Sequence, residues 1–164
     1  EAYGAAGLMR MPTRLRIDWS GDDVIVIESD AGRQTRRLEF AADAMPGERS
    51  LQGFSRAEWE RPGGGRGLFG GRGRGAGGAQ GGYLVVTTSD LLPGWLRRNG
   101  VPYSEETVMT EYFDRFAGPG GDEWLMVTTI VDDPVYLSQP YITSTHFRRE
   151  SDRSGWNPMD CGAN

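Results

Sequence analysis

Glu111, Tyr112, Arg115 and His146 are the residues of this chain whose types could support chemistry if the fold brings them together. A carboxylate or an imidazole can act as a general acid or base near neutral pH, beside a tyrosine hydroxyl. Glu111 and Arg115 share one face of a strand, so they could instead form a buried ion pair that orients a ligand. The simpler alternatives are an exposed pair at the rim of a barrel, and a structural histidine held by a neighbouring group.

The segments that carry these residues read as short strands. Apolar and polar side chains alternate with a period of two, β-branched and aromatic residues are frequent, and no helix-length amphipathic stretch lies between them. About eight strands are predicted, at residues 14–19, 23–29, 34–40, 53–59, 83–88, 107–116, 124–131 and 141–148.

Details of these segments predict how the strands are buried and joined. Residues 24–27 are continuously apolar and are expected to be buried on both faces. Gly-Pro-Gly-Gly at 118–121 and Asp-Asp-Pro at 132–134 mark turns, the two aspartates being turn formers rather than a Ca²⁺ site. Any helix at 90–98 should be short, because Pro93 and Gly94 interrupt that segment. Solvated strand faces are expected to carry the arginines Arg14, Arg16, Arg36 and Arg37.

The pattern predicts an all-β protein, an antiparallel up-and-down meander that closes on itself. We expect a single β-barrel domain over residues 1–164, with an N-terminal arm at 1–12 and a C-terminal tail at 150–164. Residues 61–82 hold twelve of the 25 glycines, four arginines and no acidic residue. This tract is expected to be a long Gly/Arg-rich hairpin loop between the fourth and fifth strands; an RNA-gripping segment and a lid over a barrel mouth are the alternatives.

Composition excludes several functional classes. A net charge of −5 argues against nucleic-acid binding by the chain as a whole, although every basic residue is arginine. The glycine tract lacks the Gly-Lys-Ser/Thr ending of a phosphate loop, and one His with one Cys gives no zinc motif. No apolar run approaches the length of a membrane span. We therefore expect no cofactor, no metal, no nucleic acid and no membrane span.

An ordered series of short motifs carries a resemblance to a known group of proteins. The motifs are Gly-Phe-Ser to Trp-Glu at 53–60, Leu-Val-Val-Thr-Thr at 84–88, Tyr-Ser-Glu at 103–105, Thr-Glu-Tyr-Phe-Asp-Arg at 110–115 and Thr-Thr-Ile-Val-Asp-Asp-Pro at 128–134. Together they resemble a family of uncharacterised secreted bacterial proteins expected to form lipocalin-like (calycin-like) β-barrels. Many relatives have a tight Gly-Asp turn where this chain has residues 61–82, and some have His-Ser in place of Tyr103-Ser104. The resemblance implies a fold and a compartment, and no activity.

The resemblance and the termini together predict a periplasmic or secreted protein. The sequence opens at Glu1 without a signal segment, which is the expectation for a mature chain. Cys161 is the single cysteine, so a free thiol is expected unless it pairs outside this chain.

Three functional classes remain open. The first is a binding protein that holds a small, partly apolar ligand in a barrel cavity, with Glu111, Arg115 and His146 fixing its orientation. The second is a cofactor-free hydrolase, lyase or isomerase that uses Glu111 or His146 as general acid or base beside Tyr112 or Tyr103. The third is a structural protein that self-assembles into a homo-oligomer through sheet edges or the glycine-rich loop. The predicted ligand-binding residues are Trp19, Trp59, Tyr103, Arg115, Trp124 and Tyr141.

Overall fold

The computed structural model describes residues 4–11, 13–60, 82–97 and 100–160. These residues form one short α-helix, one short 3₁₀ helix and ten strands. The elements are α1 (Ala5–Leu8), β1 (Leu15–Trp19), β2 (Val24–Ser29), β3 (Gln34–Glu39), β4 (Phe54–Glu60), β5 (Tyr83–Ser89), β6 (Gly94–Arg97), β7 (Val101–Tyr103), β8 (Val108–Ala117), η1 (Pro119–Gly121), β9 (Glu123–Asp132) and β10 (Tyr141–Arg148).

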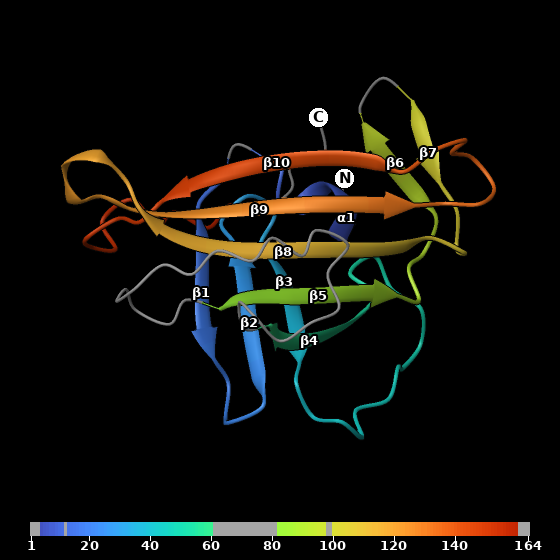
Figure 1. The fold of residues 1–164 in the computed structure, drawn as a ribbon, viewed down its shortest axis with the longest axis horizontal. Helices are drawn as coiled ribbons and strands as arrows, with labels where there is room; N and C mark the ends of the chain where they lie inside the picture. The colour runs from blue at the N-terminus through green and yellow to red at the C-terminus, as the bar shows by residue number, and fades with distance from the viewer. Residues whose placement is uncertain (1–3, 12, 61–81, 98–99, 161–164) are drawn as a thin grey trace, which may run out of the picture.

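Eight of the strands form one curled sheet in the order β1-β2-β3-β4-β5-β8-β9-β10. These are the eight predicted strands, and each observed boundary lies within one residue of its prediction. In Figure 1, β1 to β3 run across the direction of β8 to β10, because the sheet twists strongly along its width. The result is an all-β half-barrel, so the barrel-like class is confirmed.

The prediction of a wholly antiparallel meander is wrong at one place. β3 and β4 are parallel, with only two residue pairs in register, Leu38 with Ser55 and Glu39 with Arg56. A parallel neighbour needs a connection that carries the chain back along the sheet, and the irregular segment 40–53 does this. A bridge between Ser50 and Leu91 holds the returning chain in place.

Two further elements differ from the sequence prediction. In place of a short helix at 90–98, β6 pairs with β7 in a separate two-stranded antiparallel sheet. Leu96 of β6 is buried while Trp95 and Arg97 are exposed, so the segment alternates as a strand does. The expected N-terminal arm contains α1, whose alanines are buried.

The concave side of the sheet holds two apolar clusters. The first core cluster contains Met9, Ile25, Ile27, Leu38, Ala57, Leu84, Val86, Phe113 and Val127. The second core cluster contains Ala5, Ala6, Leu91, Leu96, Tyr103, Met109 and Val131. α1 lies behind β8 and β9 in Figure 1, and the residues in and just after it contribute to both clusters. The interior is thus filled by side chains.

A layer of polar side chains lies between the two core clusters. On β8, Glu111 stands between Phe113 of the first cluster and Met109 of the second. On β9, Thr129 stands in the same way between Val127 and Val131. We call this set the polar layer; its members are Gln34, Arg36, Ser55, Thr88, Glu111 and Thr129, all buried.

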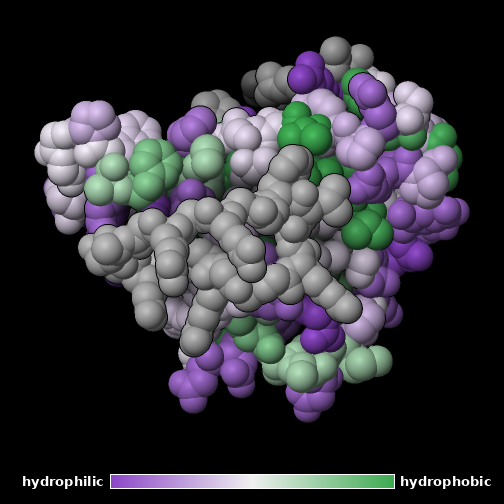
Figure 2. Space-filling view, in the orientation of Figure 1, coloured by the Kyte–Doolittle hydropathy of each residue, from purple (hydrophilic) through white to green (hydrophobic). Residues whose placement is uncertain are grey.

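Other sequence predictions have mixed outcomes. In β2, Ile25 and Ile27 are buried while Val24 and Val26 are only half-buried, so burial on both faces is wrong. β4 and β5 pair antiparallel as predicted, but the tract that joins them, apart from Gly82, lies outside the described residues, as does Cys161. Within the described part of the chain, no helix is long and apolar enough to cross a membrane. The face seen in Figure 2 carries several separate groups of hydrophobic side chains among polar ones.

Candidate functional site

A buried ion pair lies in the polar layer. Arg36 of β3 and Glu111 of β8 both have side chains that are 0% exposed, and Arg36 Nη2 donates to Glu111 Oε2 at 2.5 Å. Arg36 Nη2 also donates to Thr88 Oγ1 at 2.8 Å, and Arg36 Nε donates to Ser55 Oγ at 3.1 Å. The two hydroxyls are 2.9 Å apart and hydrogen-bonded to each other. Four strands therefore contribute to one enclosed network.

The alternation of each strand explains why these polar side chains point inward. Arg36 shares the inner face of β3 with Gln34 and Leu38, and all three are buried. Glu111 shares the inner face of β8 with Met109 and Phe113. In both strands the buried apolar neighbours determine which face points inward. The charged residue lies on that same face, so its side chain is buried as well.

One atom of each ionic partner remains unused. Arg36 Nη1 and Glu111 Oε1 are buried and have no hydrogen-bond partner among the described residues, and the same is true of Gln34 Nε2. An unsatisfied buried polar group costs about 1–3 kcal/mol, and more when it is charged. The network therefore has spare hydrogen-bonding capacity of both kinds, donors on Arg36 and Gln34 and an acceptor on Glu111.

Because the pair is buried in surroundings of low polarity, the stability of the protein is sensitive to the loss of either partner. Two paired charges offset much of each other's desolvation, whereas removal of one partner leaves the other uncompensated. Since one cation faces one anion, the pair is formally neutral. Such a pair supports a defined geometry more than it supports stability.

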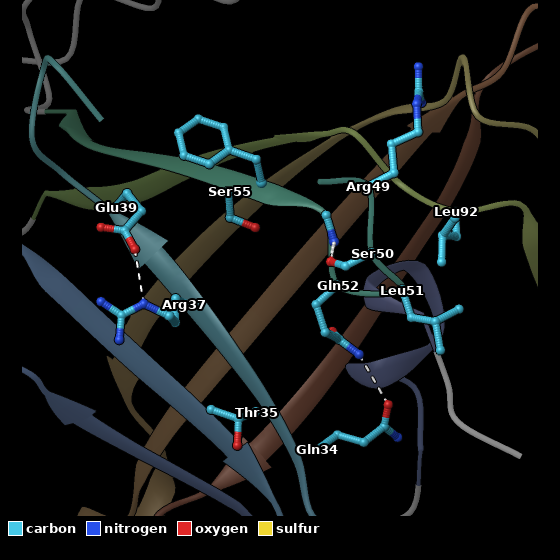
Figure 3. Close-up of a pocket in the computed structure, with 12 residues that line it drawn as sticks. Gln34, Thr35, Arg37, Glu39, Arg49, Ser50, Leu51, Gln52, Ser55 and Leu92 are labelled. Carbon is cyan, nitrogen blue, oxygen red and sulfur yellow. Dashed lines mark hydrogen bonds and ion pairs between the residues drawn. The ribbon is translucent and has the colours of Figure 1, made fainter. Parts of the chain in front are cut away.

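A cleft of about 670 Å³ opens on the flank of the half-barrel between β3 and β4. Its volume falls within the range of small-molecule sites. Figure 3 shows its walls: β3 on one side, and the segment 49–52 with the start of β4 on the other. It is lined by Gln34, Thr35, Arg37, Glu39, Arg49, Ser50, Leu51, Gln52, Gly53, Phe54, Ser55 and Leu92.

The cleft lies on the N-terminal side of the two residue pairs that join β3 and β4, where the two segments are separate. Gly53 holds the wall in place beside β5: its φ is +62°, and an added Cβ would lie 2.3 Å from the Ser89 carbonyl oxygen. Only glycine fits there without strain. Gln52 Nε2 donates to Gln34 Oε1 at 3.0 Å, which connects the two walls across the cleft (Figure 3).

Two residues belong both to the cleft and to the polar layer. Ser55 lines the cleft and accepts from Arg36 Nε, so one side chain separates the cleft from the ion pair. Gln34 lines the cleft and lies two residues before Arg36 on the same inner face. Ser55 and Gln34 therefore stand between the cleft and the pair, since neither Arg36 nor Glu111 lines the cleft and both side chains are 0% exposed.

The structure does not bring together the predicted catalytic residues Glu111, Tyr112 and His146. Glu111 points inward, whereas Tyr112 lies on the outer face against Tyr83, with ring centroids 6.4 Å apart. His146 is exposed on the outer face of β10, opposite Met126 in the β9 register. The inner face of β10 carries Tyr141, Thr143, Thr145 and Phe147 instead.

Arg115 and Trp124 lie at the far end of the β8–β9 hairpin. Arg115 is 74% exposed and pairs with Glu123 at 3.4 Å, so its partner is not Glu111. Trp124 is half-buried and stands opposite Phe116 in the register. Arg115 was predicted to pair with Glu111, either buried or at a rim, and both alternatives are wrong.

Trp19 and Trp59 gather at another rim of the half-barrel. Phe40 lies between them, with ring centroids 5.2 Å from Trp19 and 6.0 Å from Trp59. Both tryptophans are more than half exposed, although they share the inner face with the first core cluster. They are separate from the polar layer.

Tyr103 belongs to the second core cluster, and the partly buried Tyr141 packs against it. Burial raises the pKa of the Tyr103 hydroxyl, and Gly94 leaves room for it, because an added Cβ there would lie 2.6 Å from that oxygen. Tyr141 accepts hydrogen bonds from Arg10 Nη1 at 2.9 Å and Arg97 Nε at 2.8 Å. These contacts fasten the segment after α1 and β6 to β10.

Sequence reasoning missed Arg36, which we expected on a solvated face. The structure corrects this: Arg36 is 1% exposed, while Arg37 beside it is exposed. The available signal was the period of two, which puts Arg36 on the same face as Leu38 and Phe40. Among the residues that the structure describes, no group of three or more His, Cys, Asp and Glu side chains is arranged to hold a metal.

Comparison with known proteins adds no relative. No protein family model matches the chain, and no curated protein or solved structure matches it. The resemblance drawn from the sequence motifs therefore stays a prediction, and function is argued from the site.

Proposed function

We propose that this protein binds a small molecule in the β3–β4 cleft, with the polar end of that molecule directed toward Gln34, Ser55 and the Arg36–Glu111 pair. The observation that carries the proposal is the cleft itself, whose wall residues Gln34 and Ser55 also belong to the buried polar layer. A polar group bound against Gln34 and Ser55 would lie one side chain away from the pair, because Ser55 Oγ accepts from Arg36 Nε at 3.1 Å.

The cleft supports a ligand that is partly apolar. Leu51, Phe54 and Leu92 supply apolar contact area, and Thr35 and Gln34 supply polar groups. Small-molecule sites commonly combine a mainly apolar lining with a few placed polar groups. This site differs from the one expected from sequence, since it lies on the flank rather than inside a closed barrel.

Binding is favoured over catalysis by the surroundings of Glu111. Its Oε2 accepts a hydrogen bond from Arg36. Tyr112 and His146, which were predicted to act beside it, lie on the outer face of the sheet. A general base needs the proton it abstracts within hydrogen-bond reach, beside a group that completes the reaction. In the polar layer, the hydroxyls of Ser55 and Thr88 are already bonded to each other and to Arg36.

The proposal can be tested by nuclear magnetic resonance titration of the full chain. The probes are monocyclic compounds that carry an amide, a carboxylate, an amine or an alcohol. We expect at least one to shift the backbone amide signals of Gln34, Gly53, Ser55 and Leu92 in a saturable way. If every probe leaves these signals unchanged at millimolar concentration, the proposed function is wrong.

A paired substitution removes the polar end of the site while sparing the fold. Arg36→Met combined with Glu111→Leu replaces both charges by apolar side chains, a change that is often close to neutral for stability. We expect it to abolish saturable binding. The matched control makes the same substitutions in an exposed pair, Arg16→Met with Glu28→Leu, whose partners lie 3.7 Å apart, and should bind as the unmodified chain does.

A further inference from the structure

Two arginines meet at the hydroxyl group of Tyr141. Arg10 Nη1 donates to Tyr141 Oη at 2.9 Å, and Arg97 Nε donates to the same oxygen at 2.8 Å. The guanidinium carbons of these arginines lie 5.3 and 5.2 Å from the centroid of the tyrosine ring. The three side chains come from the segment after α1, the end of β6 and the start of β10, and β6 lies beside the start of β10 in Figure 1. Three separate parts of the chain therefore place two positive charges at one oxygen.

Neither arginine of this pair has a counter-ion in the part of the chain that the structure describes. No Asp or Glu there forms an ion pair with Arg10 or Arg97. Like charges within about 4–6 Å of each other are mutually unfavourable. An anion placed between them would remove that cost, and a local surplus of positive charge attracts one.

The donors around Tyr141 suit an oxygen-rich anion. Arg10 is held in position, since its Nε donates to the Ala6 carbonyl oxygen at 3.3 Å and its Nη2 donates to the Leu96 carbonyl oxygen. Arg97 Nη1 and Nη2 have no acceptor among the described residues, and the same holds for the O–H of Tyr141. A guanidinium edge with two free nitrogens binds a carboxylate or a phosphate through two parallel hydrogen bonds.

A single bound oxygen atom would lie close to all three side chains. An oxygen that accepts from the Tyr141 hydroxyl stands about 2.7 Å from Oη. Because the donating nitrogens of Arg10 and Arg97 lie within 2.9 Å of Oη, this oxygen is within about 6 Å of both, where opposite charges favour each other. Arg97 is exposed and Tyr141 is half-buried, so an ion can reach them from solvent.

We propose that Arg97, Arg10 and Tyr141 bind the dianionic phosphate group of a phosphate monoester or of inorganic phosphate. A phosphate group carries close to two negative charges and at least three acceptor oxygens, which match two cations and the free donors. A carboxylate would leave one of the two cations uncompensated. None of the three residues lines the β3–β4 cleft, so this site is separate from the one in the proposed function.

The site can be tested by titrating the full chain with sodium phosphate at constant ionic strength, above about pH 7, where phosphate is mainly dianionic. We expect saturable shifts of the backbone amide signals of Arg97 and Tyr141 in nuclear magnetic resonance spectra. Acetate should bind there at least about fivefold more weakly, because it offers one charge. The absence of saturable shifts with phosphate, or equal affinity for acetate, would overturn the proposal.

A third probe, phenyl phosphate, separates the two sources of the anion. Tighter binding of the ester than of inorganic phosphate would support a phosphorylated molecule as the ligand. Equal or weaker binding of the ester would support free phosphate.

Substitutions test which side chains hold the anion. Arg97→Gln removes one exposed cation and should weaken phosphate binding about tenfold, and Tyr141→Phe removes the hydroxyl and should weaken it about fivefold. The matched control is Arg56→Gln: this guanidinium lies 5.7 Å from the Phe54 ring centroid and donates to the carbonyl oxygens of residues 41, 42 and 44.

The control and the variants have distinct expected results. Arg56→Gln should change phosphate affinity less than about twofold, because this arginine has no second cation beside it at Tyr141. Unchanged phosphate affinity in Arg97→Gln, or an equal loss in Arg56→Gln, would show that binding is non-specific attraction to arginine and would overturn the site. Amide spectra of each variant confirm that the fold is retained.

Discussion

Glu111 and Asp133 are two of the three buried carboxylates among the described residues, and the chain holds these two in opposite ways. Glu111 is 0% exposed, faces one cation and has one oxygen without a partner among the described residues. Asp133 is 4% exposed and uses both of its oxygens. Its Oδ2 accepts from Ser104 N and Thr107 Oγ1, each at 2.5 Å, and its Oδ1 accepts from Val135 N at 2.9 Å and Tyr136 N at 2.7 Å.

The difference lies in how completely the hydrogen-bonding capacity of each carboxylate is used by the described residues. Asp133 closes the turn after β9 with neutral donors, as the Asp-Asp-Pro motif predicted, and nothing more can bind to its oxygens without breaking that turn. Glu111 depends on a charged partner from a distant strand, and its Oε1 has no hydrogen-bond partner in the described part of the chain. A buried carboxylate is thus informative about function only when its hydrogen bonds are counted.

The largest expected effect comes from breaking the buried pair on one side. Glu111→Leu leaves the Arg36 charge buried and uncompensated, and we expect it to lower the free energy of unfolding by about 3–5 kcal/mol. Urea denaturation followed by tryptophan fluorescence measures this. Adding Arg36→Met should restore most of the loss, and a loss below about 1 kcal/mol for the single variant would show that the pair is well solvated.

A smaller effect is expected at Asp133 as the pH falls. Burial would raise the pKa of Asp133, but hydrogen bonds from Thr107, Ser104 and Tyr136 overcome it and lower the pKa from 3.8 to about 2. Because the folded-state pKa is the lower one, the stabilisation is fully present above about pH 4 and is lost as the pH falls toward 2. It amounts to about 2 kcal/mol at 1.36 kcal/mol per pKa unit.

The measurement for Asp133 is the free energy of unfolding between pH 5 and pH 2 compared with Asp133→Asn. The variant removes this titration and should show a shallower loss over the same window. Equal slopes for the two proteins would mean that Asp133 does not contribute, and that other acidic groups account for acid lability.

The smallest effect is expected for an exposed ion pair. Arg16 lies 3.7 Å from Glu28 and 2.7 Å from Asp18, and all three side chains are at least 40% exposed. Arg16→Met with Glu28→Leu should change the free energy of unfolding by less than about 1 kcal/mol, because water and salt screen such pairs. The same denaturation experiment at low and high salt checks it, and a larger change would weaken the contrast with Arg36 and Glu111.

The strands could be predicted from the sequence because their signal is local. β10 was found at its observed bounds, since Tyr141, Thr143, Thr145 and Phe147 alternate with residues that are exposed. β3 and β4 were found as well, but their parallel pairing depends on the course of segment 40–53, which has no periodic pattern. The β6–β7 hairpin was not predicted, because Pro93 and Gly94 interrupt the sequence pattern at the start of a strand of only four residues.

The site was harder to predict, because it depends on which face of each strand points inward. Glu111 was selected correctly as a core-facing residue from Met109 and Phe113. Its partner Arg36 was predicted to lie on a solvated face, although Leu38 on the same face of β3 indicates burial. The contact joins residues 75 positions apart, and pattern analysis of single strands carries no information about such a distance.

The position of α1 has a consequence for how the chain acquires its fold. Ala5 and Ala6 pack with Met109 and Val131, which are made more than a hundred residues later. During synthesis α1 is made before these partners, and it lacks its final neighbours until β8 and β9 have left the ribosome. We expect maturation to be late and slow, with a strong demand for protection of the nascent chain against aggregation.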